Sequence, residues 1–200
     1  YQLGTVWQGD RMSLAADVYA INFTNQVTKH KVAGETIFSN LRGTKYRGGE
    51  IEASYLVGEG FSVYGNASYN KATQNSSGVQ LAMVPKYTAA AGVIWRQGAW
   101  YASLMAKYTG AQYGDLAQDA AGNTIGVYRF APLTLTTLSV NYTLPDALLL
   151  PKGSKLALQV FNLGDNRPLN DLGGYTGGGV PLFFTPAGRS VTFSFDVPLR

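Results

Sequence analysis

The sequence contains no cysteine, a single histidine and few charged residues. Without cysteine, neither a disulfide framework nor a thiolate metal site can form. His30 has no second histidine to complete a metal cage, so we predict neither a metal site nor a cofactor. Charged residues make up 14% of the chain, whereas soluble proteins usually contain about 25%.

Long apolar runs are also missing. No window approaches the ~18 uninterrupted apolar residues of a membrane helix, so a membrane-spanning role would require a β-barrel. The net charge of +4 is modest and the basic residues are scattered, which disfavours nucleic-acid binding. We find no convincing set of acid, base and nucleophile and predict that the protein is not an enzyme.

What the sequence does contain is period-two alternation, most regular in residues 190–200. Successive strand side chains point to opposite faces, so one face receives a run of apolar residues: Val191, Phe193, Phe195, Val197 and Leu199. The other face receives Ser190, Thr192, Ser194 and Asp196. In a soluble sheet the apolar face marks the core, whereas in an outer-membrane barrel it faces the lipid and the polar face lines the lumen.

Similar alternation predicts about nine strands along the chain. Their approximate ranges are 1–8, 11–27, 36–57, 61–73, 84–97, 99–113, 128–144, 155–165 and 189–199. The predicted connections alternate between short turns and long links. Short turns fall at 9–10, 58–60 and 97–98, with a longer Pro-containing link at 145–154, and long links fall at 28–35, 74–83, 114–127 and 166–188.

Alternating loop length is typical of a transmembrane barrel, with short periplasmic turns and long extracellular loops. Trp7, Trp95 and Trp100 all lie beside short turns, which would place them in one aromatic girdle at the periplasmic interface. The alternative is that three tryptophans fill one end of a soluble core. The range 36–57 exceeds the ~9–11 residues that cross a bilayer, so we expect this strand to project beyond the membrane on the loop side.

Five segments in order resemble the C-terminal part of a TonB-dependent outer-membrane receptor. The first is a hairpin that opens with Tyr1-Gln-Leu-Gly4 and ends with Val18-Tyr-Ala-Ile-Asn22. The others are Asn40-Leu-Arg-Gly43 with Arg47-Gly-Gly-Glu50, Val84-Pro-Lys-Tyr87, Val160-Phe-Asn-Leu-Gly-Asp165 and Gly188-Arg-Ser-Val191. None of these segments is specific alone, but together they span the whole sequence.

The resemblance implies an all-β fold: an antiparallel up-and-down transmembrane β-barrel, of which residues 1–200 supply about nine C-terminal strands out of 22. The plug domain and the TonB box of the family are expected to lie outside this sequence. One departure is the ending Leu199-Arg200, because the closing strand of the family usually ends in an aromatic residue.

Candidate ligand-binding residues lie in the predicted outer loops: Tyr113, Asp115, Tyr128, Arg129 and Tyr175. Aromatic faces together with an arginine suit a bulky anion, although interface tyrosines and a flexible Gly-rich loop would give the same residues. Glu50 and Glu52 share the predicted lumen face. The resemblance implies that they hold arginines of a plug domain, and generic lumen polarity is the alternative.

The resemblance further implies TonB-dependent active transport of a scarce nutrient across the outer membrane of a Gram-negative bacterium. A ferric siderophore is the leading ligand class, with haem, cobalamin and saccharides left open. The implied partners are outer-membrane lipid, TonB through the missing N-terminal region and a small-molecule ligand, with no nucleic acid. A passive porin-like barrel is the first alternative, and a soluble all-β binding protein is the second.

Overall fold

The computed structural model describes residues 1–24, 27–32, 35–40, 43–75, 78–118, 124–146, 150–177 and 179–198. For residues 28–32, 36, 39–40, 115–118 and 124–125 it describes the backbone alone. The predicted ending Leu199-Arg200 and the side chains of His30 and Asp115 therefore lie outside the described part. Within the described residues, no helix has the length and apolarity needed to cross a membrane.

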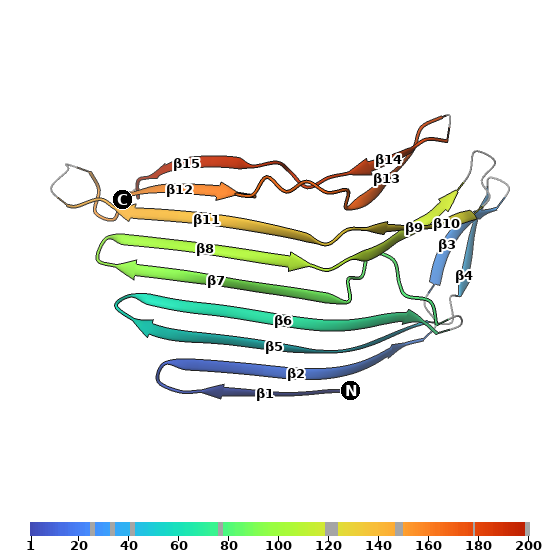
Figure 1. The fold of residues 1–200 in the computed structure, drawn as a ribbon, viewed down its shortest axis with the longest axis horizontal. Helices are drawn as coiled ribbons and strands as arrows, with labels where there is room; N and C mark the ends of the chain where they lie inside the picture. Colours follow the sequence, from blue (N-terminus) through green and yellow to red (C-terminus); the bar gives the residue numbers. More distant parts are fainter. Residues whose placement is uncertain are drawn as a thin grey trace.

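Nine antiparallel strands form one continuous sheet (Figure 1). In spatial order they are β1 (Gln2–Gln8), β2 (Met12–Phe23), β5 (Thr44–Gly58), β6 (Phe61–Gln74), β7 (Tyr87–Gln97), β8 (Trp100–Thr109), β11 (Leu133–Thr143), β12 (Lys155–Phe161) and β15 (Ser190–Asp196). Each strand pairs with the next main-sheet strand along the chain, which is the up-and-down topology that the sequence predicts.

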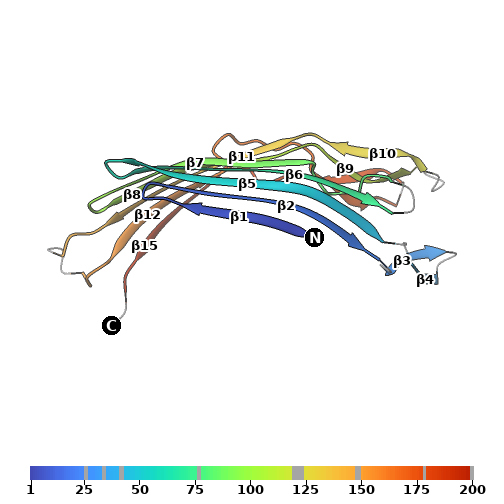
Figure 2. The same ribbon diagram turned by 90° about the horizontal axis from the view of Figure 1, so that it is seen from below.

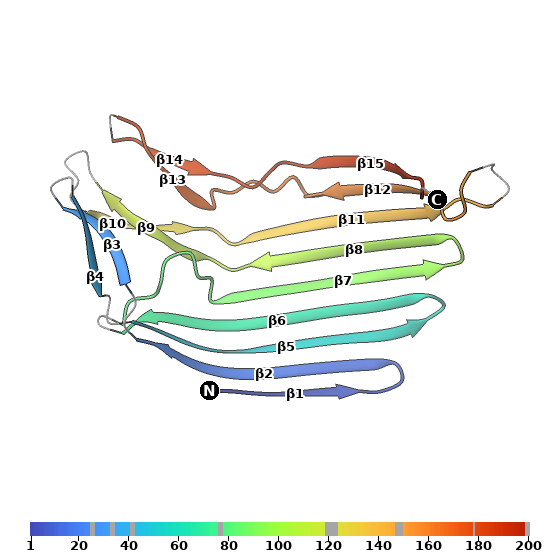
Figure 3. The same cartoon turned by 180° about the vertical axis from the view of Figure 1, so that it is seen from behind.

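Tight turns join these strands at one end of the sheet, as Figure 3 shows from behind. At Gly58, Glu59 and Gly60 the backbone has φ values of 127°, 50° and 82°. Glycine is required at Gly60, because an added Cβ would lie 2.0 Å from the carbonyl oxygen of Arg96. The predicted short turns are therefore confirmed.

Three hairpins lie at the opposite end of the sheet (Figure 1). They are β3 (Val27–Val32) with β4 (Glu35–Asn40), β9 (Gln112–Gln118) with β10 (Thr124–Phe130), and β13 (Asp171–Tyr175) with β14 (Pro181–Phe184). Three of the predicted long links therefore contain strands of their own. We refer to this side as the hairpin end and to the other as the turn end.

The predicted continuous strand over 36–57 is wrong. Residues 35–40 pair with β3 instead of continuing into the main sheet, and β5 begins only at Thr44. Gly43 has a φ of 95°, and an added Cβ would lie 1.8 Å from the carbonyl oxygen of Phe23. A glycine in this conformation permits the close approach with which the chain re-enters the sheet.

Two further predicted strands are interrupted in the structure. The range 128–144 divides into β10 and β11 around Pro132, which has no N–H to donate to a strand ladder. The range 99–113 divides around Gly110, whose N–H donates to the carbonyl of Tyr87 over 2.8 Å. The chain leaves the main sheet for the β9–β10 hairpin at Gly110 and returns to it at Pro132.

The strand register separates the main sheet into an apolar and a polar face. We define the apolar face by Phe193 and the residues in register with it across the sheet: Leu158, Val140, Ala102, Trp95 and Phe61. The polar face contains the adjacent row Thr192, Gln159, Ser139, Ser103, Ile94 and Ser62. The predicted alternation is therefore confirmed across strands as well as within them.

The apolar face is largely exposed in the described chain. Phe193, Leu3 and Val191 are 68%, 75% and 63% exposed, whereas only three of the described hydrophobic side chains are buried: Ala72, Phe130 and Val160. An apolar surface of this extent requires a non-aqueous covering. The sheet also curves (Figure 2), and its polar side is hollowed. Lipid outside and a lumen inside fit this arrangement.

Aromatic residues gather at both ends of the apolar face. At the turn end, Trp100 contacts Tyr142 with ring centroids 4.5 Å apart and the rings tilted by 39°, and Trp95 contacts Phe61 at 6.0 Å. At the hairpin end, Tyr69 contacts Tyr87 at 5.3 Å. Phe61 and Tyr69 are eight residues apart, which is about 26 Å along a strand. At a strand tilt of about 40° this corresponds to a height of about 20 Å, comparable with the ~25 Å apolar band of outer-membrane barrels.

Strand β12 is followed by a buried polar cluster around Asn162, which is 0% exposed and has a φ of 49°. Its amide donates to the carbonyls of Asn166 (3.0 Å) and Ala187 (2.9 Å), and its Oδ1 accepts from the Asn166 N–H. Asp165 accepts from the Arg189 N–H and from the Arg167 guanidinium. These bonds hold together both ends of the segment that carries β13 and β14.

Candidate functional site

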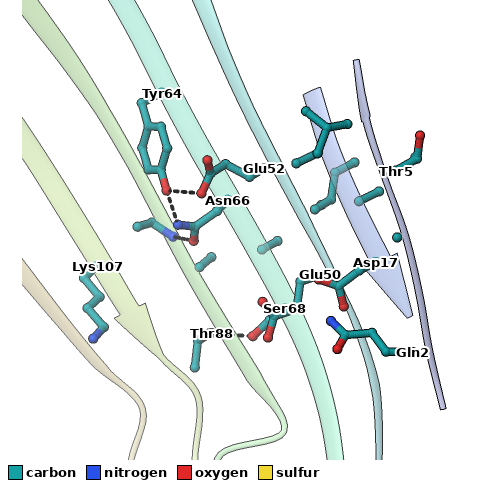
Figure 4. Close-up of a pocket in the computed structure, with 18 residues that line it drawn as sticks. Gln2, Thr5, Asp17, Glu50, Glu52, Tyr64, Asn66, Ser68, Thr88 and Lys107 are labelled. Atoms are coloured by element: carbon teal, nitrogen blue, oxygen red, sulfur yellow. Dashed lines mark hydrogen bonds between the residues drawn. The ribbon is translucent and has the colours of Figure 1, made fainter. Parts of the chain in front are cut away.

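The hollow of the polar face contains an acidic cluster on β2 and β5 (Figure 4). Asp17 lies directly opposite Glu50, and Glu52 lies two residues further along β5. The hollow has a volume of about 790 Å³. Oδ1 of Asp17 is buried without a hydrogen-bond partner among the described atoms, and none of these carboxylates forms an ion pair within the described chain.

Neutral polar groups fix one of these carboxylates. The Tyr64 hydroxyl donates to Oε2 of Glu52 over 2.8 Å, and the Asn66 amide donates to the Tyr64 hydroxyl over 2.6 Å. Oδ1 of Asn66 in turn accepts from the N–H of Ala90 at 3.0 Å. This chain of bonds orients Glu52 while leaving Glu50 to the open hollow.

The far side of the same hollow contains a lysine (Figure 4). Lys107 is in register with Glu52 through Asn66 and Ala90, three strands away. At about 4.8 Å per strand, this places the two about 14 Å apart along the sheet. The hollow is therefore acidic over β2 and β5 and basic over β8.

The outer hairpins bring the predicted loop residues together in two groups. Tyr113 and Arg129 are paired across β9 and β10. They also line a small cavity of about 80 Å³ together with Lys86, Gln80 and Gln112. Two cations and three neutral polar groups in one cavity suit an anionic group of a ligand.

The second group joins two hairpins through Tyr128 and Tyr175. A hydrogen bond with Tyr175 raises the pKa of the Tyr128 hydroxyl above its ordinary value of 10.0. The ring of Phe183 packs edge-on against both Tyr128 (5.2 Å) and Phe130 (6.2 Å). Phe130 is buried, and an added Cβ at Gly114 would lie 2.5 Å from its ring. This aromatic group is therefore a packed contact between β9–β10 and β13–β14.

Several residues of these groups escaped the sequence prediction. Asp17 and Lys107 were missed because their places in the hollow depend on cross-strand register. Phe183 was missed because the range 166–188 reads as a Gly-rich link. Among the described residues, no group of three His, Asp or Glu side chains has the geometry to hold a metal ion.

Comparison with known protein families gives one match. The family model described as "TonB dependent receptor-like, beta-barrel" matches residues 1–163. This range contains β1 to β12 and the whole acidic cluster. No curated protein matches the sequence.

Solved structures with the same fold include the copper transporter OprC, with a TM-score of 0.77 and 19% identity over 99% of this chain. The ferric yersiniabactin uptake receptor FyuA from Yersinia pestis gives 0.76 and 20% over 98%. The ferric citrate transporter FecA gives 0.74 and 20% over 96%. The chain spans only 30%, 29% and 29% of their respective lengths.

Proposed function

The chain belongs to the TonB-dependent receptor family, and from this premise we propose that it is part of an outer-membrane receptor that imports a scarce nutrient. The members of this family are transporters of the Gram-negative outer membrane and not enzymes. The observation that carries the proposal is the family match over a nine-stranded sheet with an exposed apolar face. In this reading β1 to β15 form barrel wall and outer loops.

The leading ligand is a ferric siderophore. FyuA is named as a receptor for ferric yersiniabactin and FecA as a transporter of ferric citrate, and both complexes suit a site of cations and aromatic rings. In this chain we assign ligand capture to Tyr113, Arg129, Tyr128 and Tyr175, with Asp115 on the same hairpin. Their position at the hairpin end corresponds to the extracellular side.

The test is uptake by cells that express the full-length receptor. In a host without other siderophore receptors, radiolabelled ferric yersiniabactin and ferric citrate are supplied under iron limitation, with and without TonB. Uptake that requires TonB supports active transport, whereas equal uptake without TonB indicates a passive barrel. Arg129→Gln should reduce uptake of the transported complex at least fivefold, whereas Lys155→Gln, at the turn end, should leave uptake unchanged.

We further propose that Glu50 and Glu52 face a plug domain and pair with its cationic residues. Two observations support this assignment: the carboxylates line the hollow, and they have no ion-pair partner within the described chain. A cationic surface would neutralise them and offset the repulsion between Asp17 and Glu50, which lie directly opposite each other.

The double variant Glu50→Gln/Glu52→Gln in the full-length receptor tests this pairing. We expect it to loosen the plug and to make the cells permeable to large antibiotics. Asp196→Asn is the control, because Asp196 also lies on the polar face but is paired in register with Lys155 on β12. Unchanged permeability of the double variant would contradict the assignment without affecting the transport proposal.

A further inference from the structure

The two faces of the main sheet differ in the sign of the charged side chains that their strands contain. All four carboxylates in its strands lie on the polar face: Asp17, Glu50, Glu52 and Asp196. The charged side chains on the apolar face are three cations on β5 and β6: Lys45, Arg47 and Lys71. We refer to these three as the outer cation cluster.

The outer cation cluster has no counter-charge in the described chain. Arg47 lies directly opposite Lys71, and Lys45 is one apolar-face position further along β5. All three residues are exposed, and none forms an ion pair with a described residue. Like charges directly opposite each other are destabilising in a sheet, so a bound anion would stabilise this arrangement by offsetting the repulsion.

The cluster lies at the depth of lipid headgroups. Lys71 is two residues beyond Tyr69, which belongs to the aromatic girdle at the hairpin end. Two residues of a strand tilted by about 40° rise about 5 Å. The headgroup layer of a leaflet is roughly 5–7 Å thick. The three cations therefore point outward from the sheet into the layer that contains lipid phosphates.

An apolar groove lies on the same face and begins at Ala67, four residues along β6 from Lys71. Its volume is about 530 Å³, and five neighbouring strands line it, with Ile51 and Tyr108 as its large side chains. Most of the lining consists of small residues: Ala53, Gly65, Ala67, Ala89, Ala91 and Ala106. Ala67 and Tyr69 connect the groove to Lys71 along one line of β6. A groove of this kind, which the small side chains leave open within the lipid-facing band, suits an acyl chain.

We propose that the outer cation cluster and this groove form a binding site for one phosphorylated lipid of the outer leaflet. The phosphate lies between Arg47, Lys71 and Lys45, with the bidentate geometry that arginine offers to phosphate. An acyl chain of the same molecule lies in the groove. Because the groove lies about 13 Å along β6 from Lys71, within reach of the acyl chains of a lipid whose phosphate lies at the cations, the site selects a lipid headgroup over free phosphate.

The test uses the purified full-length receptor in non-ionic detergent with bisphosphorylated lipid A as the probe. A chelator removes divalent cations, which would otherwise bridge the phosphates. Each cation near an anionic surface strengthens binding about fivefold, so Lys45→Gln/Arg47→Gln/Lys71→Gln should bind at least about tenfold more weakly. The matched control is Arg96→Gln/Lys107→Gln/Lys155→Gln on the polar face, which should bind as the wild type does.

Two ligand comparisons identify what the site recognises. Fully dephosphorylated lipid A should bind as weakly to the wild type as the phosphorylated lipid binds to the triple variant. Inorganic phosphate at millimolar concentration should not displace the lipid. Equal binding by the triple variant, an equal loss in the polar-face control, or displacement by inorganic phosphate would each overturn the proposal. Lys45→Arg/Lys71→Arg should retain binding, which separates charge from folding.

Filling the groove tests the second half of the site. Ala91→Phe should weaken binding of lipid A several-fold while the cations remain in place. Ala102→Phe is the control, because it lies on the apolar face but outside the groove. Equal binding by both variants would show that no acyl chain occupies the groove. The proposed function was argued without any of these residues, so failure here leaves it unaffected.

Discussion

The two faces of the main sheet are formed by the same nine strands but have opposite chemical character. The apolar face has no carboxylate in its strands and exposes large side chains such as Phe193 and Leu3, at 68% and 75%. The polar face contains the four strand carboxylates and two hollows whose linings include serine, threonine, asparagine and alanine. The difference shows that exposure alone does not identify a solvent-facing surface. The polar face is identified instead by the strand carboxylates, which cross-strand register places together on it.

The largest expected effect comes from introducing an arginine at one of two neighbouring positions on β11, one on each face of the sheet. Leu138→Arg places a charge in the middle of the apolar face and should destabilise the folded receptor by about 2–4 kcal/mol in lipid vesicles. Thr137→Arg, on the polar face, should cost about 0.5 kcal/mol or less, as a substitution on a solvated surface does. Urea titration of the full-length receptor in vesicles measures both. Similar losses for the two variants would contradict the assignment of the faces.

A second comparison separates buried from solvated polar groups. Asn162 is 0% exposed and makes three hydrogen bonds, so Asn162→Ala leaves buried partners unsatisfied and should cost about 1–3 kcal/mol. Asn141 lies on the polar face and serves as the control, with an expected loss below about 0.5 kcal/mol. The same urea titration applies. Equal losses would show that the buried polar cluster around Asn162 adds no more stability than a polar side chain on the surface.

The stability of the polar cluster around Asn162 should also depend on pH. The Arg189 N–H and the Arg167 guanidinium hold the pKa of Asp165 below its ordinary value of 3.8. This carboxylate therefore stabilises the fold fully above pH 3.8, and the contribution is lost as the pH falls through the lower, folded-state pKa. The hydrogen-exchange protection of residues 162–189, measured relative to the intrinsic amide rates, should fall in this acidic range. Asp165→Asn should remove the pH dependence that the wild type shows, and its persistence would contradict this cause.

The smallest expected effect concerns the outer cation cluster. Lys71→Glu places opposite charges directly across β5 and β6 and should stabilise the receptor by about 0.2–1 kcal/mol in detergent without anionic lipid. The same change should weaken binding of lipid A. Lys71→Gln should give about half of the gain in stability. Thermal unfolding in non-ionic detergent checks the sign, and a loss of stability would show that the two cations do not repel each other.

The sequence predicted the main sheet because alternation depends only on neighbouring residues. The nine strands, the tight turns and the faces of Phe61, Trp100 and Val191 follow directly from this period of two. The outer hairpins were not predicted, because β3 with β4 and β13 with β14 lack regular alternation. The break at Pro132 was available from the sequence, since proline cannot donate to a strand ladder.

The candidate sites were predictable only in part. Glu50 and Glu52 alternate with apolar residues, so their face followed from the sequence. The acidic neighbour Asp17 comes from another strand, and the pairing of Arg47 with Lys71 depends on a register that no local pattern states. Tyr128 and Tyr175 were proposed separately for the outer loops. Their hydrogen bond depends on how two hairpins pack.

The face assignment is tested most directly by labelling single positions on β15. Since residues 1–200 contain no cysteine, single cysteines at Thr192 and Phe193 can carry a nitroxide in a full-length receptor without other thiols. In lipid vesicles, oxygen should broaden the Phe193 label more strongly than a water-soluble nickel chelate, and the order should reverse at Thr192. Preferential access of the nickel chelate to the Phe193 label would contradict a lipid-facing apolar surface.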